Sequence, residues 1–589
     1  MGHLSAQTIP ESWLSAPPGL AQAQAIEEGA ARYGWAKMAT ALHNSAMSAY
    51  ARGNLPVAEA WRNVARWTAA WAEPMAKHLE RRRTAMRAAG WQVDSPAGPL
   101  PGLDQTVAEA MSGPLRLWVL ANPAFSTEYF ELEGALDFRP AVYGILSELY
   151  AADPKLFATY ASLATAIALV YDTPPPVDWP HRQVLPMALP RRLVKPTEAF
   201  AYFVSLDRAG KSLQPLAKLD SAELRFLVDL ALPDAERRWA LERVKAPLSK
   251  LESTYTDIRY REDRIDLGQY VWPSKDYSLP EIQREGGICV DQAYFATQAG
   301  KARGVPTLFF SGAGKDGRHA WFGYLGIGQK WKMDAGRYAN QRYVTGGALD
   351  PLSWTEISDH ELAFLSEGFR HERNAREAAV HAGFARWRLA DGDRAGAEQA
   401  ARAAVRLERR TLDGWDILLE LRPEPGRERE AIAYEAAGGL ASYPELQARY
   451  LGVTTDSLRR RGETARADFE ERERIRKYRA SRGDLSVQQV AGQMERARSE
   501  QSIEQQIKLY GTLLKQFGQG SGTAMWDEMV RPFLIHLLKQ GMLKEARAAL
   551  RTAREQMAVA PSSQTWAEMA AVDARIAAEE KKPAPTTRP

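Results

Sequence analysis

The stretch Arg284-Glu-Gly-Gly-Ile-Cys-Val-Asp-Gln-Ala-Tyr294 contains Cys289, the only cysteine of the chain. Two glycines, Gly286 and Gly287, precede it by three and two residues and allow a tight turn, and the helical pattern that follows continues to Arg303-Gly-Val-Pro306. We therefore expect Cys289 at the start of a helix, where unpaired N–H groups and the helix dipole favour an anion. These groups are expected to lower the pKa of the thiol, which makes the cysteine a candidate nucleophile.

A strand and a β-hairpin are predicted after this helix. The strand begins at Thr307, and the hairpin turns at Gly326-Ile-Gly328, after the glycine-rich loop 311–317. If the turn centres on residues 327 and 328, Trp321 lies opposite Asp334, and His319 shares the face of Trp321. His319 and Asp334 are then diagonal neighbours, so the carboxylate can orient the imidazole. The arrangement depends on this register, because a slip of one residue would put the two side chains on opposite faces.

Four short motifs occur in order across residues 255–345, and together they resemble the transglutaminase-like core. They are Gly287-Ile-Cys289-x-Asp291-x-Ala293, Ala302-Arg-Gly304-Val-Pro306, His319-Ala-Trp321 and Trp331-x-x-Asp334. The resemblance implies a fold similar to the papain-like core, in which the helix that carries the nucleophile packs against an antiparallel sheet. One departure is that Ala335-Gly336 follows Asp334, where the family commonly has Pro-Thr.

The resemblance also implies a catalytic triad. Cys289 attacks a carbonyl, His319 takes and returns the proton, and Asp334 holds the imidazole tautomer. The oxyanion needs two donors, of which the backbone N–H of Cys289 is one. The second is left open among three side chains: Gln283, Tyr270 and Trp272. Asp291 is interpreted as an acid of the first helical turn that supports the helix start and takes no part in the chemistry.

The expected reaction is acyl transfer or hydrolysis on the amide of a protein or peptide substrate, through a thioester. The acceptor is left open between water, as in a peptidase or amidase, and a lysine amine, as in a cross-linking enzyme. The alternative is a catalytically inactive transglutaminase-like fold within a helical-repeat scaffold that binds peptide or protein partners. No cofactor and no metal are expected, because Gly312-Ala-Gly314-Lys315 lacks the remaining residues of a phosphate loop and no histidine pair has metal-ligand spacing.

Helical hairpins are predicted on both sides of this region. In three places a glycine is followed by alanine five and twelve residues later. In a helix–turn–helix pair the glycine would lie in the turn, and the two alanines would lie where the second helix packs closely against the first. The pattern resembles the tetratricopeptide repeat, although the copies do not follow its 34-residue period. Such repeats present a surface for a protein partner. The three sets are Gly53/Ala58/Ala65, Gly392/Ala397/Ala404 and Gly541/Ala546/Ala553.

The predicted fold class is a mainly α multidomain protein with a central α+β transglutaminase-like (papain-like) domain and flanking helical hairpins or a solenoid. Changes in composition and proline-rich stretches suggest the boundaries. The predicted parts are an N-terminal helical domain (1–94), a helical segment with proline-rich linkers (95–196), a helical lead-in (197–254), the transglutaminase-like domain (255–365), a C-terminal helical repeat domain (366–578) and a disordered tail (579–589).

Composition excludes several partner classes. The chain has 589 residues and a formal net charge of only +4, which gives no reason to expect nucleic acid. The longest uncharged stretch, residues 156–171, is shorter than the roughly 20 residues that span a bilayer, so we expect a buried helix and no membrane span. The compartment is left open, and the near-absence of cysteine favours a periplasmic or secreted location over the cytoplasm.

Overall fold

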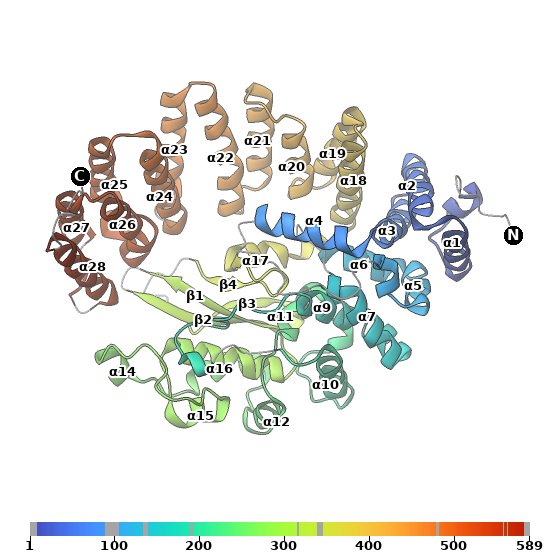
Figure 1. Cartoon of the computed structure of the whole chain (residues 1–589), viewed down its shortest axis with the longest axis horizontal. Helices are drawn as coiled ribbons and strands as arrows, with labels where there is room; N and C mark the ends of the chain where they lie inside the picture. The colour runs from blue at the N-terminus through green and yellow to red at the C-terminus, as the bar shows by residue number, and fades with distance from the viewer. Residues whose placement is uncertain are drawn as a thin grey trace, which may run out of the picture.

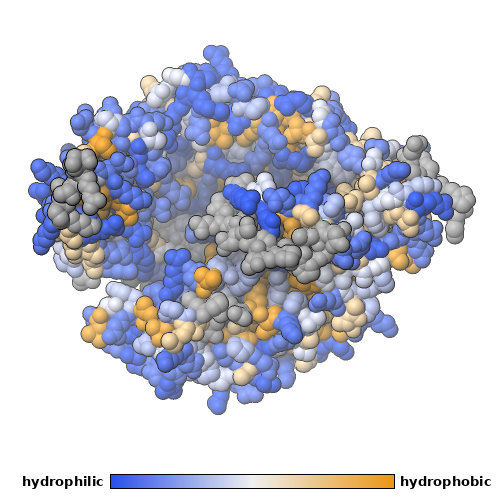
Figure 2. All heavy atoms as spheres, viewed as in Figure 1, coloured by the Kyte–Doolittle hydropathy of each residue, from blue (hydrophilic) through white to orange (hydrophobic). Residues whose placement is uncertain are grey.

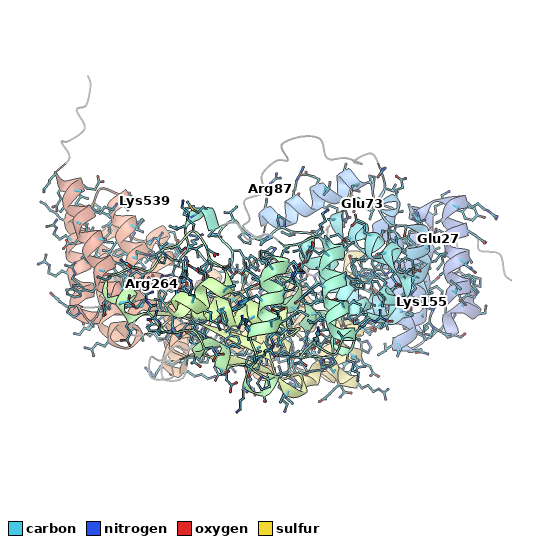
Figure 3. All side chains as sticks on the ribbon, turned by 90° about the horizontal axis from the view of Figure 1, so that it is seen from below. Glu27, Glu73, Arg87, Lys155, Arg264 and Lys539 are labelled. Carbon is cyan, nitrogen blue, oxygen red and sulfur yellow. The ribbon has the colours of Figure 1, made fainter. Side chains whose placement is uncertain are left out.

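The computed structural model describes residues 9–88, 105–132, 140–188, 193–314, 317–337, 345–478, 482–557, 559–561 and 563–581. It is mainly helical, and the described residues contain one five-stranded antiparallel sheet near the middle of the chain. In Figure 1 the C-terminal helices form an arch that begins beside the N-terminal helices, passes over the sheet and returns to its far end. Figure 3 shows Glu27 and Lys539 towards opposite ends of the long axis. The predicted mainly helical, multidomain class is confirmed.

The first half of the chain packs around one continuous hydrophobic core, which extends from Ile9 to Phe384 and includes residues of the sheet and of the helix that carries Cys289. The α+β part contains two smaller hydrophobic cores, one with residues between Leu251 and Ala335 and one with residues between Phe226 and Leu362. The helices before the sheet region are α1 (Leu20–Tyr33), α2 (Trp35–Ala51), α3 (Leu55–Trp71), α4 (Met75–Ala88), α5 (Gly113–Leu120), α6 (Pro123–Leu132), α7 (Pro140–Ala152), α8 (Pro154–Thr159), α9 (Ala161–Tyr171), α10 (Pro196–Arg208), α11 (Ser221–Val228) and α12 (Asp234–Arg243).

The long uncharged stretch forms the last four residues of α8 and all of α9, which are joined at Tyr160. In α9 all residues from Leu163 to Val170 are buried, because helices pack against it on several sides. The predicted buried helix is confirmed. Among the described residues no helix is long and apolar enough to cross a membrane.

The α+β part has its sheet in the order β3-β2-β1-β4-β5, and α16 packs on β1 and β2. The predicted strand, the hairpin and the helix that begins at Cys289 are all present. The elements are α13 (Ser253–Thr256), α14 (Glu262–Asp266), α15 (Leu279–Glu285), α16 (Cys289–Ala302), β1 (Thr307–Ala313), β2 (Arg318–Leu325), β3 (Trp331–Ala335), β4 (Gly347–Leu349), β5 (Glu356–Ser358) and α17 (Asp359–Leu365).

The C-terminal helices form an arch with two hydrophobic cores of their own, one in residues 364–450 and one in residues 475–576. The helices are α18 (Arg373–Ala390), α19 (Arg394–Leu407), α20 (Leu412–Glu420), α21 (Arg427–Gly439), α22 (Pro444–Arg460), α23 (Thr464–Tyr478), α24 (Gly483–Glu500), α25 (Ile503–Met525), α26 (Arg531–Lys539), α27 (Leu543–Met557) and α28 (Gln564–Glu580). Because α28 reaches Glu580, it extends into the predicted tail, of which residues 582–589 lie outside the described residues.

The three predicted helix turns are present at the glycines that the spacing singled out. Gly53, Gly392 and Gly541 have φ angles of 80°, 83° and 72°, a backbone region that favours glycine. They join α2 to α3, α18 to α19 and α26 to α27. The alanines at plus five and plus twelve are buried in every copy, where their small side chains allow two helices to approach closely.

The arch is fixed to the rest of the molecule at both ends. At its start, α18 packs on the α2–α3 hairpin, where the rings of Tyr50 and Phe384 stack with centroids 4.2 Å apart. At its end, the N–H of Thr523 donates to the carbonyl oxygen of Gly314, beyond strand β1, at 3.2 Å. Figure 2 shows a hollow between the arch and the α+β part.

Candidate active site

Cys289 is the first residue of α16, as predicted, and the two preceding glycines are required by close contacts. Gly286 has a φ of 75°, and a Cβ at this position would lie 2.5 Å from the carbonyl oxygen of Arg259. A Cβ on Gly287 would lie 2.3 Å from the Cβ of Asp291. The tight turn therefore depends on glycine at both positions, and it sets the helix start directly against the neighbouring backbone.

Cys289 begins α16, which packs on strand β2, and the backbone N–H of Ala320 on that strand helps to stabilise the thiolate. Burial raises the pKa of the thiol to about 11, and the N–H groups of Ala320, Val290 and Cys289 itself lower it only in part. The prediction of a lowered pKa is therefore wrong, because desolvation of the thiolate outweighs the donors of the helix start. At neutral pH the sulfur is protonated.

His319 on β2 is the residue directly before Ala320, so its imidazole belongs to the same corner of the site. Its Nε2 lies 2.7 Å from the carbonyl oxygen of Gly336. Because a carbonyl only accepts, Nε2 carries the proton, and Nδ1 is the acceptor nitrogen of the neutral ring. Burial lowers the pKa of His319, which keeps the ring neutral at pH 7. Its ring stacks on Trp321 at 5.9 Å, so the two residues share a face as predicted.

Asp334 does not take the predicted position, because the hairpin register differs from the expected one. Leu325 pairs with Trp331, and a β-bulge then places Phe322 opposite Ala335. Trp321 was expected opposite Asp334, so the register is shifted by one residue near the turn and by two beyond the bulge. The side chain of Asp334 is exposed, and the backbone of Gly336, two residues later, occupies the place beside the imidazole. The predicted register is therefore wrong.

The three alternatives for the second oxyanion donor lie in different surroundings. Gln283 is exposed on α15 and does not line the cavity that contains Cys289. The indole of Trp272 is buried, and its N–H donates to the carbonyl of Asp276 at 2.8 Å. Tyr270 lines the cavity and packs against the same hydrophobic cluster as Cys289. Of the three side chains, only that of Tyr270 lies in the cavity.

Asp291 caps the start of α16, as interpreted from the sequence, and it also forms a buried ion pair. Its Oδ2 accepts from the N–H of Ile288 at 2.9 Å and from Nη1 of Arg264 at 2.8 Å. Both charged side chains are at most 2% exposed, so each depends on the other for its charge. Arg264, labelled in Figure 3, thereby ties α14 to the first turn of α16.

Residues between 176 and 183 of the proline-rich stretch contribute to the site, and nothing in the sequence places them beside Cys289. Residues 176 and 178–183 line the cavity beside Cys289. Nδ1 of His181 accepts from the N–H of Gln183 at 3.2 Å, so Nε2 donates to the hydroxyl of Tyr277 at 2.7 Å. That hydroxyl donates to Oδ1 of Asp291 at 3.1 Å, which links the segment to the start of α16. A histidine among prolines was the only signal in the sequence.

The cavity has a volume of about 1120 Å³, and the C-terminal helices supply part of its wall. Arg318, next to His319, forms two-point hydrogen bonds with the carboxylates of Asp527 and Glu568, the shortest at 2.7 Å to each. Although burial alone would raise the pKa of Glu568, the donors Arg318 and Trp526 lower it overall. The end of the arch is therefore held directly beside the candidate site.

Within the described ranges no group of three His, Cys, Asp or Glu side chains is placed to hold a metal ion. The chain matches no protein-family model and no curated protein.

Proposed function

We propose that this protein is a transglutaminase-like cysteine enzyme that transfers or hydrolyses the acyl group of a peptide or protein amide through a thioester on Cys289. The observation that carries the proposal is that Cys289 and His319 line the same cavity, together with Ala320, which directly follows His319 on β2. A cysteine at a helix start and an imidazole on the adjacent strand, both lining one cavity, are the groups that nucleophilic catalysis requires.

In the proposed reaction His319 acts as a general base. Nδ1 accepts the thiol proton while the sulfur attacks the amide carbonyl, so a C–S bond forms and the carbonyl oxygen becomes an oxyanion. The imidazolium then returns the proton to the amide nitrogen, the C–N bond breaks, and an amine leaves. Because burial lowers the pKa of His319, the neutral ring is available as a base at physiological pH.

The oxyanion would accept from the backbone N–H of Cys289 and from the hydroxyl of Tyr270. Tyr270 is favoured over Gln283 and Trp272 because its side chain alone of the three lines the cavity. The carbonyl of Gly336 would take the orienting role that the resemblance assigns to Asp334, since it holds Nε2–H at 2.7 Å. The thioester would be resolved by water or by a lysine amine, whichever reaches the acyl group first.

The test is mass spectrometry of the intact protein after incubation with activated peptide esters. We expect an acyl adduct on Cys289 that hydroxylamine removes, no adduct on the Cys289→Ser protein under the same conditions, and at least a 100-fold slower adduct in His319→Ala. His371→Ala is the matched control, because His371 is exposed in a short helix outside the cavity. Equal acylation of wild type and His319→Ala would refute the proposal.

The second candidate is a peptide-binding scaffold without activity. Two observations favour it: the pKa of the Cys289 thiol is raised to about 11, and Asp334 is exposed. A protein of this kind would bind peptides equally well as wild type and as Cys289→Ser, and it would form no hydroxylamine-sensitive adduct.

A further inference from the structure

The cavity extends along α16, well beyond the nucleophile. Cys289 begins the helix, and Thr297, Gln298 and Lys301 line the same cavity further along it. With a rise of about 1.5 Å per residue, Thr297 lies about 12 Å and Lys301 about 18 Å along the helix axis from Cys289. A ligand whose carbonyl meets the thiol therefore has room for several more residues of chain.

The far end of the cavity contains a buried ion pair. Nζ of Lys301 donates to Asp229, and it also donates to the carbonyl oxygen of Phe226 at 2.7 Å. Lys301 is 1% exposed and Asp229 is 5% exposed. Because the charges compensate each other, this end of the cavity is polar and has no net charge. A charged ligand group would remain unpaired here, which is unfavourable away from water.

Thr297 adds a hydroxyl that the protein itself does not satisfy. Its side chain is 3% exposed, and among the described residues its Oγ1 has no hydrogen-bond partner. A hydroxyl can donate one hydrogen bond and accept two, and leaving it unpaired when buried is unfavourable. An uncharged ligand group that both donates and accepts would satisfy it, and the neighbouring ammonium of Lys301 could donate to the same group.

We propose that Thr297 and Lys301 form a subsite for a side-chain carboxamide of a peptide substrate, about four residues from the carbonyl that Cys289 attacks. An extended peptide rises about 3.3 Å per residue, so four residues cover the distance from Cys289 to Thr297. A carboxamide has an oxygen that accepts from Lys301 and N–H groups that donate to Oγ1 of Thr297. This inference rests on the proposed function, because it assumes a peptide whose carbonyl meets the thiol.

Binding by the Cys289→Ala protein tests the subsite without any reaction. The probes are fluorescent nonapeptides of alanine and serine that carry one glutamine, moved by one position from peptide to peptide, with methionine or glutamate as replacements. At one position we expect glutamine to bind at least 10-fold more tightly than methionine, and glutamate to bind more weakly than either. In wild-type protein, the mass of the acyl group on Cys289 identifies the carbonyl that was attacked, and hence the number of residues between it and the glutamine.

Three substitutions test whether Thr297 causes the preference for glutamine. Thr297→Val removes the hydroxyl at nearly the same volume and should abolish the preference for glutamine, whereas Thr297→Ser should retain it. Thr165→Val is the matched control, since Thr165 is also a buried hydroxyl without a partner among the described residues but lies on α9, outside the cavity. A preference that persists in Thr297→Val, or equal binding of glutamine and methionine at every position, overturns the inference.

The two proposals fail in different experiments. Loss of the glutamine preference with intact acylation of Cys289 would overturn the subsite alone. Absence of acylation, with a preference that depends on Thr297 in the Cys289→Ala protein, would overturn the proposed catalysis and leave a peptide-binding cavity.

Discussion

The imidazole of His319 donates its Nε2–H to the carbonyl oxygen of Gly336 at 2.7 Å, and so a backbone group orients it. Gly336 is suited to this place, because a Cβ there would lie 2.7 Å from the ring of Tyr255. The exposed side chain of Asp334 lies two residues earlier on the same strand end. A backbone acceptor carries no full charge, so it fixes the tautomer of the ring but raises the pKa of His319 less than a carboxylate would, and burial lowers this pKa overall.

Asp334→Asn should therefore change the rate of acyl-enzyme formation by less than about 3-fold, whereas loss of the general base in His319→Ala should cost about 10²-fold or more. Single-turnover mass spectrometry measures both rates. A loss of 100-fold or more in Asp334→Asn would mean that the hairpin changes register when substrate binds.

The pH dependence of alkylation tests the protonation state of the thiol. Because burial raises the pKa of Cys289 to about 11, the rate with iodoacetamide should rise with pH throughout the range from 7 to 10, without a plateau. A preformed thiolate–imidazolium pair would instead give a plateau that begins in the acidic range. Circular dichroism at each pH serves as the control, because it shows that the fold is retained.

Gly287→Ala should destabilise the helix start. The new Cβ would lie 2.3 Å from the Cβ of Asp291, so the carboxylate must leave Ile288 and Arg264. We expect a loss of about 3 kcal/mol, similar to that caused by breaking a buried ion pair. Gly144→Ala in α7 is the control: nothing lies within 4 Å of the added carbon, and the helix should gain about 0.5–1 kcal/mol. Denaturant midpoints compare the two, and equal midpoints would contradict the packing described here.

A double substitution can distinguish the contribution of the Arg264–Asp291 ion pair to stability from that of general packing. Arg264→Met leaves a carboxylate that is fully buried, at 0% exposure, and should cost about 3–5 kcal/mol. Asp291→Asn in the same protein removes the uncompensated charge and should recover much of that loss. Thermal unfolding midpoints measure the recovery, and strictly additive losses would show that the ion pair itself contributes little.

The contact that closes the arch should weaken in acid. The pKa of Glu568 is lowered from its ordinary value of 4.5, so its bond to Arg318 stabilises the closed arch fully above that value and is lost as the pH falls through the lowered pKa. Small-angle scattering should show a larger radius of gyration as the pH is lowered well below 4.5, and Glu568→Gln should show part of this increase already at pH 7. Glu580→Gln is the control, because its partner Arg547 lies outside the cavity wall.

The local features near Cys289 could be predicted because they depend on short-range chemistry. Glycines before the cysteine set the turn, and periodicity gave α16, the strand after it and the hairpin. The glycine–alanine spacing likewise gave three helix turns. In each case the decisive residues lie within about fifteen positions of one another.

What could not be predicted depends on contacts between distant segments. A β-bulge near Gly323 shifts the register, and no residue pattern in the hairpin signals it. The raised pKa of the thiol comes from burial by the whole fold, which the helix start alone does not reveal. His181 lies more than a hundred residues before Cys289, and Glu568 lies far beyond it, so only the tertiary structure brings them to one cavity.

The ion pairs of Arg318 with Asp527 and Glu568 also mean that the cavity can be completed only late in synthesis of the chain. Cys289 and His319 leave the ribosome long before α28 is synthesised. The cavity of the nascent chain therefore lacks part of its wall until Glu568 has emerged. Products that stop earlier would contain Cys289 and His319 but would leave the cavity open on one side. The cavity that contains Cys289 is therefore enclosed only when the last described helix has been made.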